Sequence, residues 1–170
     1  SRDGRFVLIV SRATNLATPV ELEVDFDVFV HDRATGDTTC VSVDPTGAPG
    51  NGASLYGTSI TDDGRYVAFS SAATNLVTGD TNGVDDIFVR DLVKKMTTLV
   101  SRSRAAPGPI TTGDGASPAS AGAGTEFIGG PAISDAGRFI VFQSEATNLL
   151  DPAAGVADTN GLPDIFVFDR

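Results

Sequence analysis

Residues 59–76 read SITDDGRYVAFSSAATNL, and residues 85–101 read DDIFVRDLVKKMTTLVS. In both stretches, short runs of Val, Ile, Phe and Tyr are bounded by Gly, Asp, Asn and Ser, which is typical of β-strands joined by turns. Asp63-Gly64 is a hairpin signal, because glycine tolerates the positive φ that a tight turn requires. This region therefore predicts four antiparallel strands. Their ranges are Leu55–Thr61, Arg65–Ser70, Asp86–Asp91 and Thr97–Ser101.

Three motifs occur in the same order three times along the chain. A Gly-Arg pair followed by an aromatic-aliphatic run begins at residues 4, 64 and 137. Ala-Thr-Asn-Leu follows at 13–16, 73–76 and 146–149, and Asp-[Val/Ile]-Phe-Val-x-Asp follows at 27–32, 86–91 and 164–169. Four-stranded units repeated along a chain are the signature of a β-propeller, so we predict an all-β fold of about three four-stranded blades.

The repeated motifs resemble the TolB-like, WD-repeat-like β-propeller repeat family, over residues 1–43, 55–101 and 132–170. The resemblance specifies a fold more than a function. It implies periplasmic or secreted bacterial proteins, in which such blades act as protein-binding platforms or as domains attached to hydrolases.

The repeats divide the chain into three predicted blades with their linkers. These are residues 1–54, residues 55–125 and residues 126–170. The first blade lacks its first strand and the third lacks its last strand. Propellers close with 4–8 blades, so we expect an excerpt of a longer propeller, or missing strands supplied by neighbouring chains. The linker at 102–125 is rich in Gly, Ala, Pro and Ser, and it is interpreted as a flexible loop or insertion.

The charge balance excludes two classes of partner. The 170 residues include 22 acidic and 12 basic ones, for a net charge of -10, and only Lys94 and Lys95 are lysines. Nucleic-acid binding needs clustered positive charge, and an anionic membrane surface attracts the same charge. No stretch approaches the ~18 apolar residues that span a bilayer. The single Cys40 excludes an internal disulfide and a multi-cysteine zinc site.

Two loops fit the pattern Asp-x-Asn-Gly-x-x-Asp. Short side-chain oxygens at alternate positions, with a glycine that permits a tight bend, can surround a hard cation such as Ca²⁺. The predicted Ca²⁺ ligands are Asp80, Asn82 and Asp86 in the second unit, and Asp158, Asn160 and Asp164 in the third. The alternative interpretation is a pair of Asx-turns whose side chains hold the backbone.

The first unit departs from this pattern. It has Glu21, Glu23 and Asp27 at the matching offsets but lacks Asn-Gly, so a metal site there is doubtful. A structural role is expected for the asparagine of each Ala-Thr-Asn-Leu motif: its amide satisfies a turn while the following leucine packs inward. These asparagines are Asn15, Asn75 and Asn148.

Catalytic arrangements are scarce. No Gly-x-Ser-x-Gly elbow is present. His31 occupies a repeat position that carries Arg90 and Phe168 in the other units, which indicates an exposed and tolerant site. Cys40 takes the place of Leu99 and is expected to behave as a small buried apolar residue.

The sequence leaves three functional hypotheses. The first is a non-catalytic, extracytoplasmic propeller segment that binds or scaffolds a protein partner or further blades, stabilised by Ca²⁺. The second is the propeller domain of a secreted hydrolase or lyase, and the third is a structural repeat of an extracellular assembly. The extracytoplasmic assignment depends on the family resemblance, the scarcity of lysine and the predicted calcium loops.

Overall fold

The computed structural model describes residues 1–17, 25–55, 57–104, 111–117, 130–151, 155 and 157–170. Over these residues the chain forms strands and turns and no helix. The strands are β1 (Phe6–Ser11), β2 (Asp27–Asp32), β3 (Thr38–Cys40), β4 (Thr58–Ile60), β5 (Tyr66–Ser71), β6 (Asp86–Asp91), β7 (Met96–Leu99), β8 (Ala132–Ile133), β9 (Phe139–Ser144) and β10 (Asp164–Asp169). A helix long and apolar enough to cross a membrane is accordingly absent from the described part of the chain.

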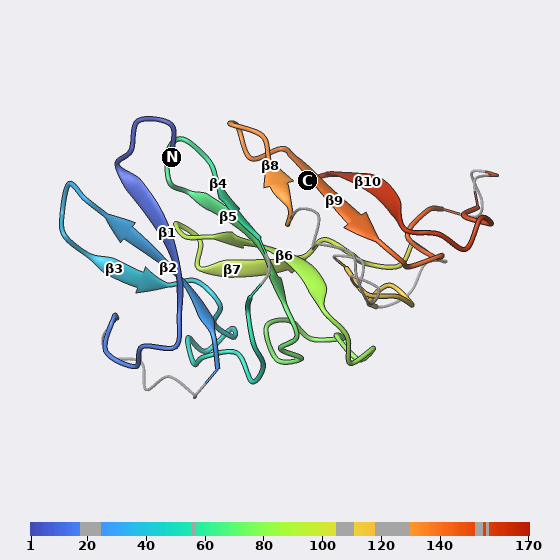
Figure 1. Cartoon of the computed structure of the whole chain (residues 1–170), viewed down its shortest axis with the longest axis horizontal. Coiled ribbons are helices and arrows are strands. Elements are labelled where there is room, and N and C mark those ends of the chain that lie inside the picture. Colours follow the sequence, from blue (N-terminus) through green and yellow to red (C-terminus); the bar gives the residue numbers. More distant parts are fainter. Residues whose placement is uncertain (18–24, 56, 105–110, 118–129, 152–154, 156) are drawn as a thin grey trace, which may run out of the picture.

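The strands form three antiparallel sheets that lie side by side in chain order (Figure 1). Blade 1 is the sheet β1-β2-β3, blade 2 is β4-β5-β6-β7, and blade 3 is β8-β9-β10. In each sheet, strands that are consecutive in sequence are hydrogen-bonded neighbours, so each blade is a simple meander. The prediction of an all-β fold is confirmed. The three sheets have three, four and three strands, as expected if the first blade lacks its first strand and the third blade lacks its last strand.

Two strands of blade 2 are shorter than predicted, and β5 is shifted by one residue, from the predicted Arg65–Ser70 to Tyr66–Ser71. The first was expected over Leu55–Thr61 and pairs only over Thr58–Ile60. It is cut short because Gly57 adopts a φ of 60° and lies against the backbone of Gly130, its counterpart in blade 3. The last strand ends at Leu99, two residues early, because the N–H groups of the next two residues both turn to the Ile87 carbonyl oxygen.

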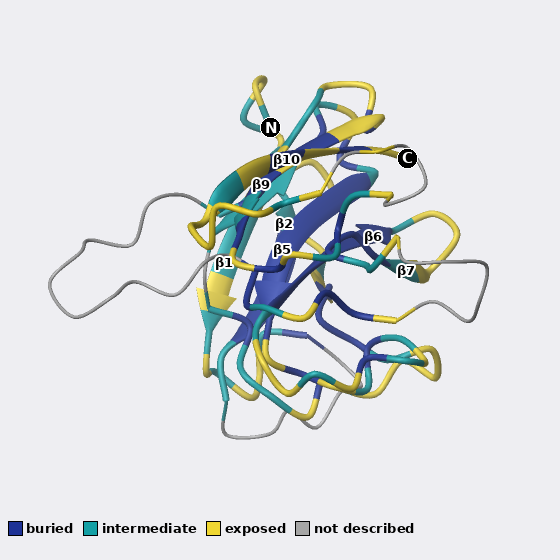
Figure 2. Cartoon of the chain, turned by 90° about the vertical axis from the view of Figure 1, so that its right-hand side faces the viewer, coloured by how far each residue is buried: buried dark blue, intermediate teal, exposed yellow. Residues whose placement is uncertain are grey.

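The apolar core lies between the blades. Blade 2 is buried on both faces, so β5 and β6 are buried along their whole length, whereas β10 alternates between buried and exposed positions (Figure 2). One cluster joins blades 1 and 2 through Val28, Val30, Val41, Val67, Phe69, Phe88 and Leu99. The other joins blades 2 and 3 through Tyr66, Ala68, Ile87, Val89, Ile140, Phe142, Phe166 and Phe168.

The Gly-Arg motif forms the same turn in all three blades. Gly4, Gly64 and Gly137 have φ of 73°, 72° and 69°, and the N–H of each donates to the carbonyl oxygen three residues earlier. A Cβ on Gly64 would clash with the ring of Phe6, and one on Gly137 would clash with the ring of Tyr66. The aromatic residue of one blade therefore covers the glycine turn of the next blade.

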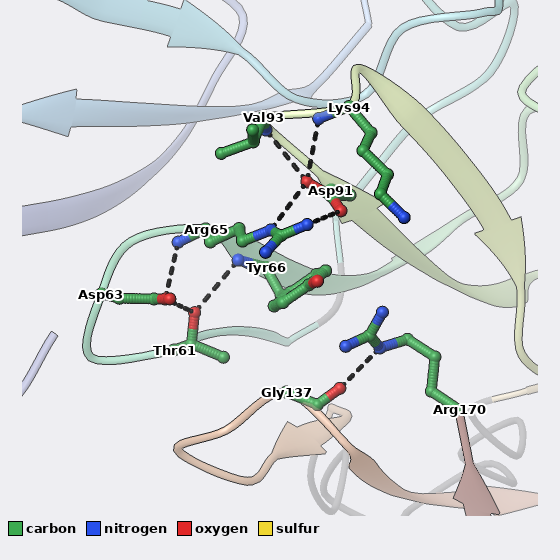
Figure 3. A network of polar contacts seen from close by, with 9 residues as sticks. All are labelled: Thr61, Asp63, Arg65, Tyr66, Asp91, Val93, Lys94, Gly137 and Arg170. Atoms are coloured by element: carbon green, nitrogen blue, oxygen red, sulfur yellow. Dashed lines mark hydrogen bonds and ion pairs between the residues drawn. The ribbon is translucent and has the colours of Figure 1, made fainter.

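Each arginine of this motif pairs with the last aspartate of its own blade's Asp-[Val/Ile]-Phe-Val-x-Asp strand. In blade 2, Arg65 donates from Nε and Nη2 to the two carboxylate oxygens of Asp91, at 3.2 and 2.9 Å, and the N–H groups of Val93 and Lys94 also donate to Asp91 (Figure 3). The equivalent pairs are Arg5–Asp32 and Arg138–Asp169, both at 2.7 Å. The three pairs differ mainly in exposure, since Asp91 is 7 % exposed and Asp169 is 52 % exposed.

The linkers contain a fourth repeated element, Gly-[Asn/Asp]-Gly-Ala-Ser, at residues 50–54 and 113–117. Its first glycine N–H donates to the preceding blade, from Gly50 to Ser42 O at 2.9 Å and from Gly113 to Ser101 O at 2.8 Å. Its serine bonds the following blade, as in the 2.6 Å hydrogen bond between Ser117 Oγ and Ser144 Oγ. Within the predicted 102–125 loop, residues 111–117 thus join blades 2 and 3 by these hydrogen bonds; residues 105–110 and 118–125 lie outside the described residues.

The asparagines of Ala-Thr-Asn-Leu hold these linkers in place. Asn75 Oδ1 accepts from the Asn51 N–H at 3.0 Å, and Asn148 Oδ1 accepts from the Asp114 N–H at 3.1 Å. The leucines that follow them, Leu76 and Leu149, are buried. The predicted structural role is confirmed for Asn75 and Asn148.

Candidate functional site

The predicted metal loop of blade 2 brings two carboxylates into the interior of the molecule. Asp86 opens β6 and is completely buried, and Asp80 precedes it in the β5–β6 loop and is 7 % exposed. Asp86 Oδ1 accepts a 2.5 Å hydrogen bond from Ser101 Oγ. The other oxygen of Asp86, Oδ2, and Oδ1 of Asp80 are buried and have no hydrogen-bond partner in the described chain.

The linker to blade 3 closes over this loop. Asn82 Nδ2 donates to the carbonyl oxygen of Gly113 at 3.0 Å, and the N–H of Ser117 donates to the carbonyl oxygen of Asp85 at 2.7 Å. Asn82 Oδ1 accepts from the N–H of Val84 at 3.2 Å, which is the Asx-turn of the alternative interpretation. The turn and the buried carboxylates therefore coexist, and the turn does not supply partners for the two free oxygens.

The electrostatics of the loop disfavour a negative charge. Burial raises the pKa of Asp80 to about 6. Burial also raises the pKa of Asp86 to about 7, against the opposing hydrogen bond from Ser101 and with the help of the nearby charges of Asp80 and Asp85. Burial of an ionised carboxylate without a countercharge is costly, so these two groups require either a proton or a cation.

The donor set of the loop consists of oxygen atoms. Within the described residues, no three His, Cys, Asp or Glu side chains converge in a metal-binding arrangement. The candidate ligands are thus two carboxylates, Asp80 and Asp86, supplemented by amide or main-chain oxygens of the loop. Carboxylate and carbonyl oxygens suit Ca²⁺, whereas a structural zinc site would need nitrogen or sulfur ligands.

The matching loop of blade 3 is open. Asp164 is half-buried, Asn160 is exposed, and Asn160 Nδ2 donates to Asp164 Oδ2 at 3.0 Å. Asp158 is half-buried, although its Oδ2 atom is buried and unpartnered. The structure thus brings these three residues near one another without the enclosure seen in blade 2, and a metal site in this loop stays a prediction.

Blade 1 uses the equivalent aspartate differently. Asp27 is buried, and its Oδ1 accepts a 2.7 Å hydrogen bond from Ser42 Oγ. Burial raises the pKa of Asp27, while the bond from Ser42 acts in the opposite direction. Glu21 and Glu23 lie outside the described residues.

Sequence reasoning missed the serines and the linker that complete these sites. Ser42 and Ser101 each donate to the aspartate that opens the neighbouring strand, and Gly113 accepts from Asn82. A signal was present: the serines both follow the last strand of their blade, and Gly113 belongs to the second copy of Gly-[Asn/Asp]-Gly-Ala-Ser. A search for repeats inside the linkers would have found them.

The only histidine and the only cysteine of the chain do not form a nucleophile pair. Cys40 is buried in β3, and burial raises the pKa of its thiol to about 11. His31 Nδ1 lies 3.0 Å from Thr38 Oγ1, with which it shares a hydrogen bond. A cysteine nucleophile needs a lowered pKa and an adjacent base, and Cys40 has neither feature.

A groove of about 270 Å³ runs along β10, between this strand and the segment that follows β7. Its lining is mostly apolar and includes Phe142, Leu149 and Phe166, together with the charged Arg102. The Arg102 guanidinium lies 5.1 Å from the centre of the Phe168 ring. The groove is thus a continuation of the apolar contacts between blades.

Comparisons with known proteins agree with the fold. No protein-family model matches the sequence, and no curated protein matches it. Among solved structures, the tricorn protease is 16 % identical with a TM-score of 0.55, and the match covers 99 % of this chain and 13 % of that one. TolB from Acinetobacter baumannii is 15 % identical with a TM-score of 0.48, and the match covers 98 % of this chain and 27 % of that one. The chain therefore spans a small part of either protein, and at this identity the likeness to the tricorn protease, itself a β-propeller protein, supports the fold alone.

Proposed function

We propose that this chain is a non-catalytic β-propeller segment that serves as a protein-binding or scaffolding platform. The observation that carries the proposal is an exposed apolar surface on blade 3, which we call the outer face. It is formed by Phe139, Val141, Ile165 and Val167, which are 40, 39, 68 and 64 % exposed. Exposed apolar surface gathered on one sheet face marks an interaction site.

The repeat identifies what kind of partner fits the outer face. The equivalent residues of blade 2 are Tyr66, Ala68, Ile87 and Val89, which are 8, 0, 0 and 2 % exposed. They are buried because they pack against blade 3. The outer face of blade 3 has a similarly apolar composition at the same strand positions, so its partner is a further blade of the same kind.

The glycine turns make the match more specific. Phe6 covers Gly64 and Tyr66 covers Gly137, and Phe139 is the next aromatic residue in this series. Gly4 is the complementary element: its φ is 73°, and the nearest atom to a Cβ built there is Arg33 Nη1, at 3.6 Å. In the isolated chain, the partner blade is therefore blade 1 of a second copy, with its Gly4 turn against Phe139.

Sedimentation velocity of the full chain tests this proposal. We expect self-association that increases with protein concentration and is lost in Ile165→Asp, because a carboxylate on the outer face cannot be buried against an apolar sheet. Val93→Asp is the matched control, since Val93 is 71 % exposed and lies outside the outer face. A chain that stays monomeric at all concentrations, or equal association in both variants, would contradict the proposal.

The absence of catalysis has its own test. We expect no turnover of generic ester or peptide substrates, because the buried Cys40 thiol, with a pKa of about 11, stays protonated at neutral pH. Turnover that disappears in His31→Ala would show that the chain is an enzyme.

The proposal includes a location outside the cytoplasm. It is supported by the resemblance of the repeats, by the presence of two lysines against ten arginines, and by the acidic loops. Protease added to intact cells that produce the protein should degrade it after the outer membrane or wall is permeabilised, with the inner membrane still intact. Degradation only after lysis would place the protein in the cytoplasm.

A further inference from the structure

The β5–β6 loop of blade 2 contains two buried carboxylate oxygens whose partners are not accounted for. Asp80 is 7 % exposed and Asp86 is 0 % exposed, so both exceed nine-tenths burial. Among the residues that the structure describes, nothing forms a hydrogen bond with Asp80 Oδ1 or Asp86 Oδ2. Buried polar atoms in folded proteins nearly always have a partner, so each exception requires an explanation such as an ion.

Within the described residues, no ion pair includes either of these oxygens. The three ion pairs of the described chain are Arg5–Asp32, Arg65–Asp91 and Arg138–Asp169, and none of them includes Asp80 or Asp86. The half-buried Asp85 adds a third negative charge beside Asp86. The loop is therefore a buried acidic site that lacks a countercharge from the protein.

We infer that the β5–β6 loop of blade 2 binds one Ca²⁺ ion between Asp80 Oδ1 and Asp86 Oδ2, with the remaining ligands from Asn82, main-chain carbonyls and water. The other Asp86 oxygen is already fixed by Ser101 Oγ, which leaves Oδ2 free for the ion. This site is independent of the outer face of blade 3 and of its partner.

The donor chemistry selects the ion. Residues 72–86 contain no His or Cys, so the loop offers oxygen donors alone. Ca²⁺ accepts six to eight oxygen ligands in irregular geometry, whereas Mg²⁺ requires near-octahedral geometry and gives up its water reluctantly. An irregular loop with a glycine at residue 83, where φ is 71°, suits the larger and less demanding ion.

The position of the site gives the ion a structural effect. Asn82 bonds Gly113 and Asp85 bonds Ser117, and Ser117 in turn bonds Ser144 of blade 3. Occupancy of the loop therefore stabilises the junction of blades 2 and 3. The ion is assigned to blade 2 because Asp80 and Asp86 are buried there, whereas Asp158 and Asp164 of blade 3 are half-buried.

Isothermal titration of the full chain with Ca²⁺, after treatment with chelator, tests the inference. We expect one site in the wild-type chain, loss of this site in Asp86→Asn, and retention in Asp164→Asn, the matched change in blade 3. The asparagine amide oxygen still accepts the bond from Ser101, so Asp86→Asn preserves the fold. Titration with Mg²⁺ should give much weaker binding.

Thermal unfolding supplies a readout that does not depend on heats of binding. At a free Ca²⁺ concentration 100 times the dissociation constant, a ligand that binds only the folded state raises the folding equilibrium constant about 100-fold. The wild-type chain should show this gain, and Asp86→Asn should not. In chelator, Asp86→Asn should unfold at the same temperature as the wild type or higher, because it removes a buried charge.

Three results would overturn the inference: no Ca²⁺ binding by the folded wild-type chain, binding that persists in Asp86→Asn, or a loss in Asp164→Asn that equals the loss in Asp86→Asn. A lower melting temperature of Asp86→Asn in chelator would also count against it, since this would show that the carboxylate is stabilised by the protein alone.

Discussion

Blades 2 and 3 contain the same motifs in the same order, yet they bury very different shares of them. In blade 2 every residue of β5 and β6 is buried, whereas in blade 3 alternate residues of β9 and β10 are exposed. The ion pairs differ in the same way, since Arg65–Asp91 is more buried than Arg138–Asp169. The loops do too: the β5–β6 loop is closed and the β9–β10 loop is open. The comparison teaches that in a repeat fold the neighbouring blade, more than the blade's own residues, determines which groups are buried. It also supplies matched variants.

The largest contrast is expected for one isoleucine that occupies the same strand position in both blades. Ile87 is 0 % exposed and Ile165 is 68 % exposed. Ile87→Ala removes buried methyl and methylene groups and leaves a cavity, so it should lower the free energy of unfolding by about 2–5 kcal/mol. Ile165→Ala should change it by less than about 0.5 kcal/mol in the monomeric chain. Urea denaturation measures both, and equal losses would show that the blades do not differ as described.

The glycine turns should give the next largest effect. Both glycines have a left-handed backbone, so alanine is strained at either position. In Gly137→Ala the new Cβ also clashes with the ring of Tyr66, whereas Gly4→Ala has no such clash. The strain costs about 1–2 kcal/mol in each variant, and the clash adds to it at Gly137. We expect Gly137→Ala to be the more destabilising of the two by at least about 1 kcal/mol in the same denaturation experiment. If Gly4→Ala were the more destabilising variant, the contact between the aromatic ring and the glycine turn would not contribute to blade packing.

A smaller difference is expected between the ion pairs. Asp91 accepts from two nitrogen atoms of Arg65 and from two main-chain N–H groups, and its side chain is 7 % exposed. Asp91→Asn keeps one acceptor oxygen but loses the charge, at a cost of about 1.5 kcal/mol. Asp169→Asn should have no measurable effect on the unfolding midpoint, because exposed ion pairs contribute little. A loss in Asp169→Asn as large as that in Asp91→Asn would contradict this ranking.

Asp91 should also make the stability of the chain depend on acid. Burial acts to raise its pKa, but Arg65, Lys94 and Val93 outweigh burial and hold the pKa of Asp91 at about 2, below its ordinary value of 3.8. A lowered folded-state pKa gives stability that is fully present above about pH 4 and is lost as the pH falls through about 2. Between these values, unfolding curves of the wild type should depend more steeply on pH than those of Asp91→Asn. Identical slopes would mean that the ion pair does not stabilise the folded state.

The sequence alone predicted the elements whose cause is local. The Gly-Arg turns, the strand Asp86–Asp91 and the inward leucines Leu76 and Leu149 follow from turn chemistry and hydrophobic pattern, and the structure confirms them. The Ca²⁺ site predicted at Asp80, Asn82 and Asp86 stays a prediction. What the sequence did not predict depends on contacts between blades. Segment 111–117 is held by hydrogen bonds from Gly113 to Ser101 and from Asp114 to Asn148, and Asn148 is more than 30 residues away in the chain. The composition of this segment predicted only a flexible loop or insertion.

The same limit applies to the two predicted metal loops. Their sequences match, so the sequence could not distinguish them. The structure distinguishes them by burial: segment 113–117 packs over the loop of blade 2 through Asn82 and Asp85, whereas Asp158 and Asp164 are half-buried. Burial of a carboxylate is a property of the assembled fold, and this property decides which loop requires a cation.

Native-state hydrogen exchange of β6 and β10 tests most directly whether a neighbouring blade sets the environment of these strands. In dilute solution, the N–H groups of β10 that bond to β9 should exchange orders of magnitude faster than those of β6, because one side of their sheet is uncovered. At concentrations where copies of the chain associate, protection of β10 should rise while protection of β6 stays constant, and Ile165→Asp should abolish the rise. Equal protection of the two strands in the dilute monomer, or protection of β10 that never changes with concentration, would contradict the account.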